Sequence, residues 1–309
     1  MPRLIDDIRA RGVQMPLFVA PEHETAWVAY ARRILPALTE PALPVLLIDN
    51  VADYYYVGTG QEYWDLSRDF PNLAPPFDCF WCEHRLAGRI HSDAKGDTDA
   101  RGLLGKEARM GVFFLVFDSQ DIERGKDFPA GTRWVYMAEI FIHYDHVKGD
   151  RAHGPHGTIL IAVDAEGRIL DAPQIQSYGG PECNEVMKHI MIWLHPSLLA
   201  ICFLHCKNVT VVDEAVAKPL AKKHHARTGQ WPVKYKTLVI EPLKQVLRAQ
   251  GKSGEVGLAK AMHICRGHFA DYTQGKGLFG KYHGRYWMPA VVRGTKGKSA
   301  PAREIEIKV

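Results

Sequence analysis

The chain has 309 residues, 46% of them hydrophobic, and a formal net charge of +4. This length and apolar content are enough to bury one large core or two smaller ones, and the aromatic share of 10% excludes a disordered protein. The opening residues, MPRLIDDIRARG, lack the uninterrupted apolar segment of a secretory signal, so we expect a cytoplasmic protein.

The first predicted element is a helix over residues 22–38. Trp27, Tyr30 and Ile34 recur there at helical spacing, and Pro36 should end or bend the helix.

A sheet is predicted next. Residues 111–117, 134–144 and 157–163 are rich in β-branched and aromatic side chains and are separated by Gly, Asp and Pro. Residues 164–167 (DAEG) predict a hairpin turn into residues 168–170. These strands favour a largely antiparallel sheet.

The most apolar stretch, residues 186–206, contains Lys188, three histidines and Pro196. This composition is poor for a membrane span and typical of a core helix, expected over residues 182–206 with an interruption near Pro196. The helix should cover one face of the sheet, and a short strand should follow at residues 209–212. The polar residues 92–105 are predicted to form a loop.

Four cysteines suggest a zinc site that we do not favour. Cys79 and Cys82 lie in a strand-like run, where residues three apart point to opposite faces, and Cys202 and Cys206 lie in the apolar helix. We therefore expect no metal and no cofactor.

Charge divides the chain in two. Residues 215–309 contain 19 Lys and Arg against 5 Asp and Glu, which leaves 20 basic and 30 acidic residues in 1–214. We therefore expect an α+β fold with two domains. Residues 1–214 should be an acidic partner-recognition domain, with a mainly antiparallel sheet and a long packed helix. Residues 215–309 should be a basic α+β lobe that attracts polyanions in a salt-dependent manner.

Nucleic-acid contacts are predicted at two places in the basic lobe. The first is a cationic helix ended by Gly229 and Pro232, followed by a strand at 234–240, with Trp231 between them able to stack on a base. The second is the tract 263–294, which contains a single acid, Asp271. The expected contact residues are Lys222, Lys223, Arg227, Lys234, Lys236, Lys276, Lys281, Arg285, Trp287 and Arg293. The alternative is a solvated helix face and a tract that only packs.

These motifs resemble a known family. The run KKHHARTGQWPVKYKTLVI, followed by HxxRGHxxxYTxGKG and RYWMPAVVRG, is similar to a phage and plasmid accessory family that includes a type V-A anti-CRISPR protein. The segment PFDCFWCE at residues 76–83 resembles a family strand that ends in a carboxylate, here Glu83.

The resemblance implies a regulator carried by a mobile genetic element and acting in the bacterial cytoplasm. Such a protein would bind a nascent polypeptide at the ribosome and bring about degradation of the translated mRNA. The partners implied are thus a nascent chain or ribosome and RNA, without a membrane.

Two other functions remain open from the residues alone. A metal-independent endoribonuclease needs a base, an acid and a cation at the scissile phosphate, and His263, Arg266, His268 and Tyr272 are of the required types. On a strand His263 points away from the other three unless Gly267 introduces a bulge. The remaining alternative is a non-catalytic nucleic-acid-binding accessory protein.

Overall fold

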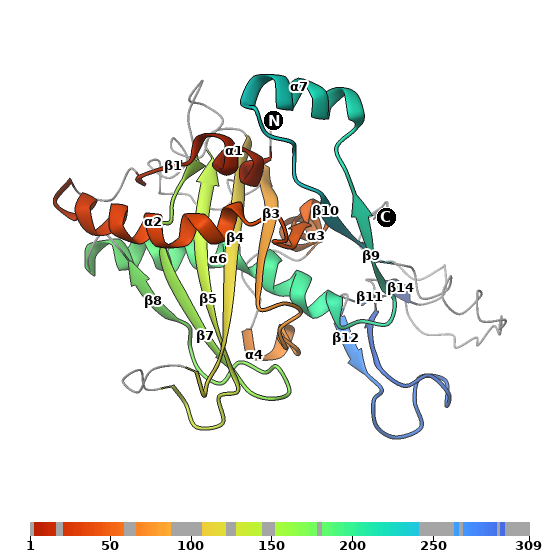
Figure 1. Ribbon diagram of the computed structural model, residues 1–309. Coiled ribbons are helices and arrows are strands. Elements are labelled where there is room, and N and C mark those ends of the chain that lie inside the picture. Colours follow the sequence, from red (N-terminus) through yellow and green to blue (C-terminus); the bar gives the residue numbers. More distant parts are fainter. Residues whose placement is uncertain are drawn as a thin grey trace.

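The structure is a computed structural model. It describes residues 3–16, 21–58, 66–87, 107–121, 128–143, 152–177, 181–240, 263–265, 268–288 and 291–293. These residues form an α+β fold around one ten-stranded mixed sheet (Figure 1). The α+β class predicted from the sequence is confirmed.

Eight strands run across the sheet in the order β1 (Val13–Gln14), β6 (Ala152–His153), β5 (Trp134–His143), β4 (Glu107–Asp118), β3 (Cys79–Ala87), β2 (Val45–Leu47), β10 (Tyr235–Ile240) and β9 (Val209–Glu214). Off this path, β7 (Gly157–Val163) pairs with β5, and β8 (Gln174–Ser177) pairs with β7.

The sheet is less uniformly antiparallel than the sequence predicts. The strands from β3 to β8 pair antiparallel, but β2 is parallel to both β3 and β10, and β1 is parallel to β6. Between β2 and β3 the chain passes through α3 (Asp49–Gly58) and α4 (Leu66–Asp69), and this crossover returns it in the same direction.

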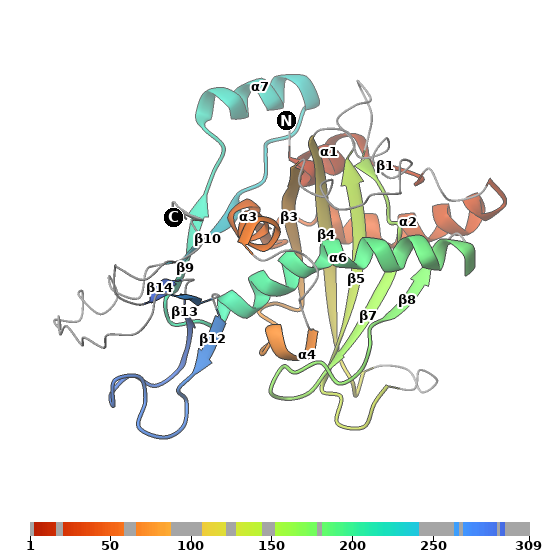
Figure 2. The same ribbon diagram turned by 180° about the vertical axis from the view of Figure 1, so that it is seen from behind.

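Helices cover both faces of the sheet. The helix α1 (Leu4–Arg11), the short turn η1 (Pro21–His23) and α2 (Glu24–Thr39) lie on one side, and α6 (Pro181–Leu204) and α3 lie on the other (Figures 1 and 2). Alternation along β3 divides its side chains between two cores: Trp81 packs in the core beneath α1 and α2, and Phe80 in the core beneath α3 and α6. Among the described residues, no helix has the length and continuous apolar character of a membrane span.

The sequence predicts that two prolines interrupt their helices, but both helices continue past the proline. The helix α2 continues through Pro36 to Thr39, and α6 continues through Pro196 to Leu204. Residues 194–203 of α6 are buried in the core, and this packing offsets the hydrogen bond that proline cannot donate.

The turn at residues 164–167 is present as predicted, because Gly167 N donates to Asp164 O and Asp164 N donates to Arg168 O. The predicted loop at 92–105 lies outside the described residues.

Cys79 and Cys82 lie on opposite faces of β3, and Cys202 and Cys206 lie in or directly after α6, as the sequence predicts. Cys79 packs in the core beneath α1 and α2, whereas Cys82, Cys202 and Cys206 belong to the opposite core. Burial raises the pKa of the Cys202 thiol to about 12, so this thiol is protonated at neutral pH. Cys79 and Cys82 therefore do not face a common site.

The C-terminal strands form two short antiparallel sheets beside the large sheet, which we together call the C-terminal ribbon. Its inner part pairs β11 (His263–Cys265) with β14 (Val291–Arg293), and its outer part pairs β12 (His268–Asp271) with β13 (Arg285–Met288). Asn208 attaches the ribbon to the end of α6, since its side chain donates to Trp287 O and accepts from Trp287 N.

Candidate nucleic-acid interface

The helix α7 (Lys218–Thr228) stands apart from the body of the protein. It connects β9 to β10 and lies beyond the end of the sheet (Figures 1 and 2). No residue of α7 is buried, and Leu220 is 60% exposed. We call residues 215–234 the basic arm. An isolated helix of this length has marginal stability in water, so its ends must help to hold it.

Both ends of α7 carry residues that favour a helix boundary. Pro219 lies in the first turn, where its missing N–H breaks no helical hydrogen bond. Gly229 follows the last turn with a φ of 74° and donates its N–H to His225 O at 2.8 Å. The predicted helix end at Gly229 is therefore confirmed.

The arm carries positive charge and contains no acidic residue. Lys222, Lys223 and Arg227 are exposed, and α7 contains no Asp or Glu. Trp231 is 61% exposed, and its ring stacks on His225 with 4.4 Å between centroids and 26° between planes. The arm thus combines cations for phosphates with an aromatic ring for a base.

The base of the arm is fixed to α1. Val233 is buried, its N–H donates to Asp6 Oδ1 at 2.8 Å, and its carbonyl accepts from Arg3 Nη1 at 3.0 Å. The Arg3 guanidinium also lies 4.3 Å from the ring centre of Tyr235. The segment that follows the exposed helix is therefore attached to α1.

The two predicted lysines of the strand after the arm differ in their surroundings. Lys234 is exposed, whereas Lys236 lies on β10 and its Nζ is 2.6 Å from Asp213 Oδ1 on β9. This ion pair neutralises part of the charge that Lys236 would offer to a phosphate. Lys222, Lys223, Arg227 and Lys234 are exposed cations and offer more charge to an anion than Lys236 does.

The predicted catalytic residues are spread over the C-terminal ribbon. His263 lies on β11 and His268 is exposed on β12, while Arg266 lies outside the described residues. Tyr272 follows β12, and its ring lies 6.3 Å from that of Tyr286. The described pairs are His263–Arg293 to Cys265–Val291 and His268–Met288 to Asp271–Arg285. Gly267, where the sequence places a possible bulge, lies outside the described residues.

Other residues predicted to bind RNA on the ribbon have different environments. Trp287 is only 3% exposed and packs edge-on against Phe203 and Tyr54, so it is a core residue and its ring cannot stack on a base. Lys276 and Lys281 are exposed in the loop between β12 and β13. Arg293 lies on β14, where only the backbone is described.

Glu83 lies in the middle of β3, fully buried, and not at a strand end. Its carboxylate accepts from Leu4 N at 2.8 Å, Ile5 N at 3.1 Å and Arg109 Nε at 2.6 Å. Trp81 Nε1 is a further donor at 3.1 Å. Glu83 therefore binds the first turn of α1 to the sheet, as a carboxylate at a helix N-terminus does.

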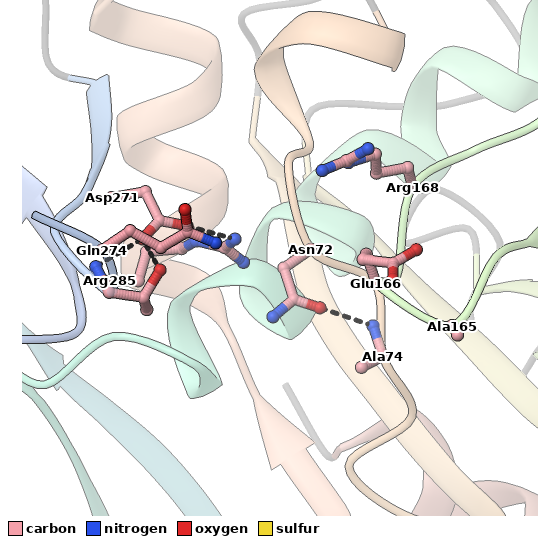
Figure 3. A pocket seen from close by; sticks show the side chains of 9 residues that line it. Asn72, Ala74, Ala165, Glu166, Arg168, Asp271, Gln274 and Arg285 are labelled. Carbon is pink, nitrogen blue, oxygen red and sulfur yellow. Dashed lines mark hydrogen bonds and ion pairs between the residues drawn. The ribbon is translucent and has the colours of Figure 1, made fainter.

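A pocket of about 530 Å³ opens beside the ribbon (Figure 3). Three segments that are distant in the sequence line it: the stretch before β3, the hairpin after β7, and the outer part of the ribbon. The lining residues are Asn72, Ala74, Ala165, Glu166, Arg168, Asp271, Thr273, Gln274 and Arg285. Apart from Arg285, the sequence did not indicate these residues, because no local motif joins them.

One ion pair shapes the pocket wall. Arg285 Nη2 lies 2.8 Å from Asp271 Oδ2, and Thr273 donates both its N–H and its hydroxyl to Asp271 Oδ1. The bonds from Thr273, reinforced by Arg285, lower the pKa of Asp271 to about 2. Asp271 therefore remains a carboxylate at any physiological pH.

Within the described ranges, no group of three or more His, Cys, Asp or Glu side chains is arranged to hold a metal ion. No protein-family model, curated protein or solved structure matches this chain. The assignment of function therefore depends on the residues of the arm, the ribbon and the pocket.

Proposed function

We propose that this protein is an anti-CRISPR-like regulator of a phage or mobile genetic element. In this proposal it recognises a nascent protein in the cytoplasm of a bacterial host and down-regulates the translated mRNA. Residues 1–214 recognise the polypeptide, and the basic lobe, residues 215–309, contacts RNA or the ribosome. The sequence resemblance at residues 222–240 and 263–294 supports the proposed anti-CRISPR-like regulatory role.

One observation supports the proposed contact with RNA. The basic arm presents Lys222, Lys223 and Arg227 on a helix with no buried residue and no acid, next to the exposed Trp231. A helix with no buried residue contributes little to the core, so its charge pattern is not explained by folding. A single RNA strand offers phosphates to the lysines and a flat base to Trp231.

The fixed base of the arm adds to this support. Because Asp6 and Arg3 hold Val233, the backbone at the base of the arm keeps a defined position, and less of its conformational freedom is lost on binding. Electrostatic attraction to phosphates is long-ranged at low salt and decreases as salt screens it.

Binding of a fluorescent single-stranded RNA, measured by anisotropy over a salt series, tests the RNA contact. We expect the double variant Lys222→Glu with Lys223→Glu to bind weakly and to lower the salt slope by about 1.4, at roughly 0.7 per lost phosphate contact. The matched control reverses Arg32 and Arg33, two exposed residues of α2, and makes the same change in net charge. Equal weakening by both pairs would show a general charge effect and no specific role of the arm.

A second assay separates the regulator from the endoribonuclease and from a plain nucleic-acid-binding protein. RNA incubated with the protein in EDTA should remain intact, and the protein should co-sediment with translating ribosomes. Cleavage in EDTA that disappears in His268→Ala would favour the endoribonuclease. Binding to free RNA without ribosome association would favour the accessory protein.

A further inference from the structure

We propose that the pocket between the hairpin after β7 and the C-terminal ribbon is a nucleotide-binding site, in which Arg168 holds the phosphate. This inference goes beyond the basic arm, because the pocket residues are separate from α7. Nucleotide binding by the pocket and RNA binding by the basic arm can therefore be tested with separate variants.

The donors of the pocket are suited to a phosphate. Arg168 has no side-chain partner among the described residues, and in Figure 3 its guanidinium extends toward Asp271 and Arg285. Asn72 uses its Oδ1 to accept from Ala74 N at 2.9 Å, which leaves its amide nitrogen as a donor. A guanidinium with a neighbouring amide matches the several oxygens of a phosphate.

Two arginines, Arg168 and Arg285, line the pocket beside two acids, Glu166 and Asp271. Lys207 is exposed, and its backbone N–H donates to the carbonyl of Arg285, a residue of the pocket lining. Asp271 is already engaged by Arg285 and Thr273, so its charge is largely compensated.

Glu166 favours a nucleotide over a simple inorganic anion. Its carboxylate is exposed on the hairpin and lines the same pocket as Arg168. A carboxylate would repel an isolated phosphate, but it accepts hydrogen bonds from ribose hydroxyls. The pocket volume, about 530 Å³, lies within the range of small-ligand sites.

Isothermal titration of the full chain with adenosine 5′-monophosphate, and with adenosine as the phosphate-free probe, tests this site. We expect the monophosphate to bind at least about tenfold more tightly than adenosine, the factor that corresponds to one charge-assisted contact. Arg168→Gln should remove that preference. Arg168 is exposed, so this variant should fold, and Arg32→Gln on α2 is the matched control.

Two further measurements complete the test. The variant with Lys222→Glu and Lys223→Glu should keep the affinity for the monophosphate, even where it loses affinity for RNA. Competition by a 5′-phosphorylated RNA pentamer would assign the site to an RNA end, and lack of competition would assign it to a free nucleotide. Equal binding of monophosphate and adenosine, an unchanged preference in Arg168→Gln, or stronger competition by a glutamate-rich peptide would overturn the proposal.

Discussion

The indole ring of Trp231 stacks on the imidazole of His225, with 4.4 Å between ring centroids, at the C-terminal end of α7. His225 covers one face of the indole, and Trp231 is still 61% exposed. The pair therefore prearranges a ring on which an RNA base can stack at little entropic cost.

Replacement of Trp231 by Ala should weaken RNA binding by about tenfold, because stacking contributes roughly 1–3 kcal/mol per base. The melting temperature should change little, since the ring is mostly exposed. Anisotropy with single-stranded RNA measures the affinity, and Phe117→Ala, at another exposed aromatic, is the control. An unchanged affinity in Trp231→Ala would show that the ring does not contact RNA.

The buried carboxylate of Glu83 should be important for stability. Glu83→Gln removes the nearer carboxylate of Arg109, whose other ionic partner, Asp49, is 3.8 Å away, and it weakens the attachment of α1, so we expect the free energy of unfolding to fall by about 3 kcal/mol. Urea denaturation measures this, with Glu24→Gln in the exposed first turn of α2 as the control. A variant of normal stability that no longer bound RNA would instead make Glu83 a functional residue.

Gly111 is required because of its neighbour Trp81. A Cβ added at Gly111 would lie 1.9 Å from the indole atom Cζ2 of Trp81. Overpacking of this kind costs about 1–3 kcal/mol or more, so Gly111→Ala should lower the urea midpoint. Combining Gly111→Ala with Trp81→Phe should cost less than the sum of the two single changes. Strict additivity would contradict the proposed contact.

Acid should destabilise the protein through its buried histidines. Burial lowers the pKa of His156 and of His195 to about 4, and burial together with Arg109 lowers that of His84 to about 3. An unfolded histidine titrates near about 6.5, so between about pH 6.5 and 4 the unfolded chain binds more protons than the folded chain. The stabilisation is fully present above pH ~6.5 and is lost as the pH falls through this window.

Urea unfolding at several pH values between about 7 and 5 measures this loss. Each buried histidine contributes at most about 1.4 kcal/mol per pH unit. His195→Gln should therefore make the pH dependence shallower, although it also changes the bond between Tyr55 and His195. A free energy of unfolding that stays constant over this range would contradict the prediction.

The sequence by itself determined the local elements of this protein. The β-branched runs predicted β4, β5 and β7, and the glycine after a polar helix predicted the end of α7 at Thr228. It also indicated the positive charge of the arm. These features depend on short-range backbone preferences and side-chain periodicity, which the sequence contains directly.

Only the tertiary structure decided which of the residues with suitable chemistry face solvent. Trp287 and Trp231 are both tryptophans in basic segments, yet packing against Phe203 buries the first and the projection of α7 exposes the second. The pocket likewise unites Asn72, Arg168 and Gln274 from distant segments. Burial and long-range proximity arise from how the elements pack together, and no local pattern in the chain encodes them.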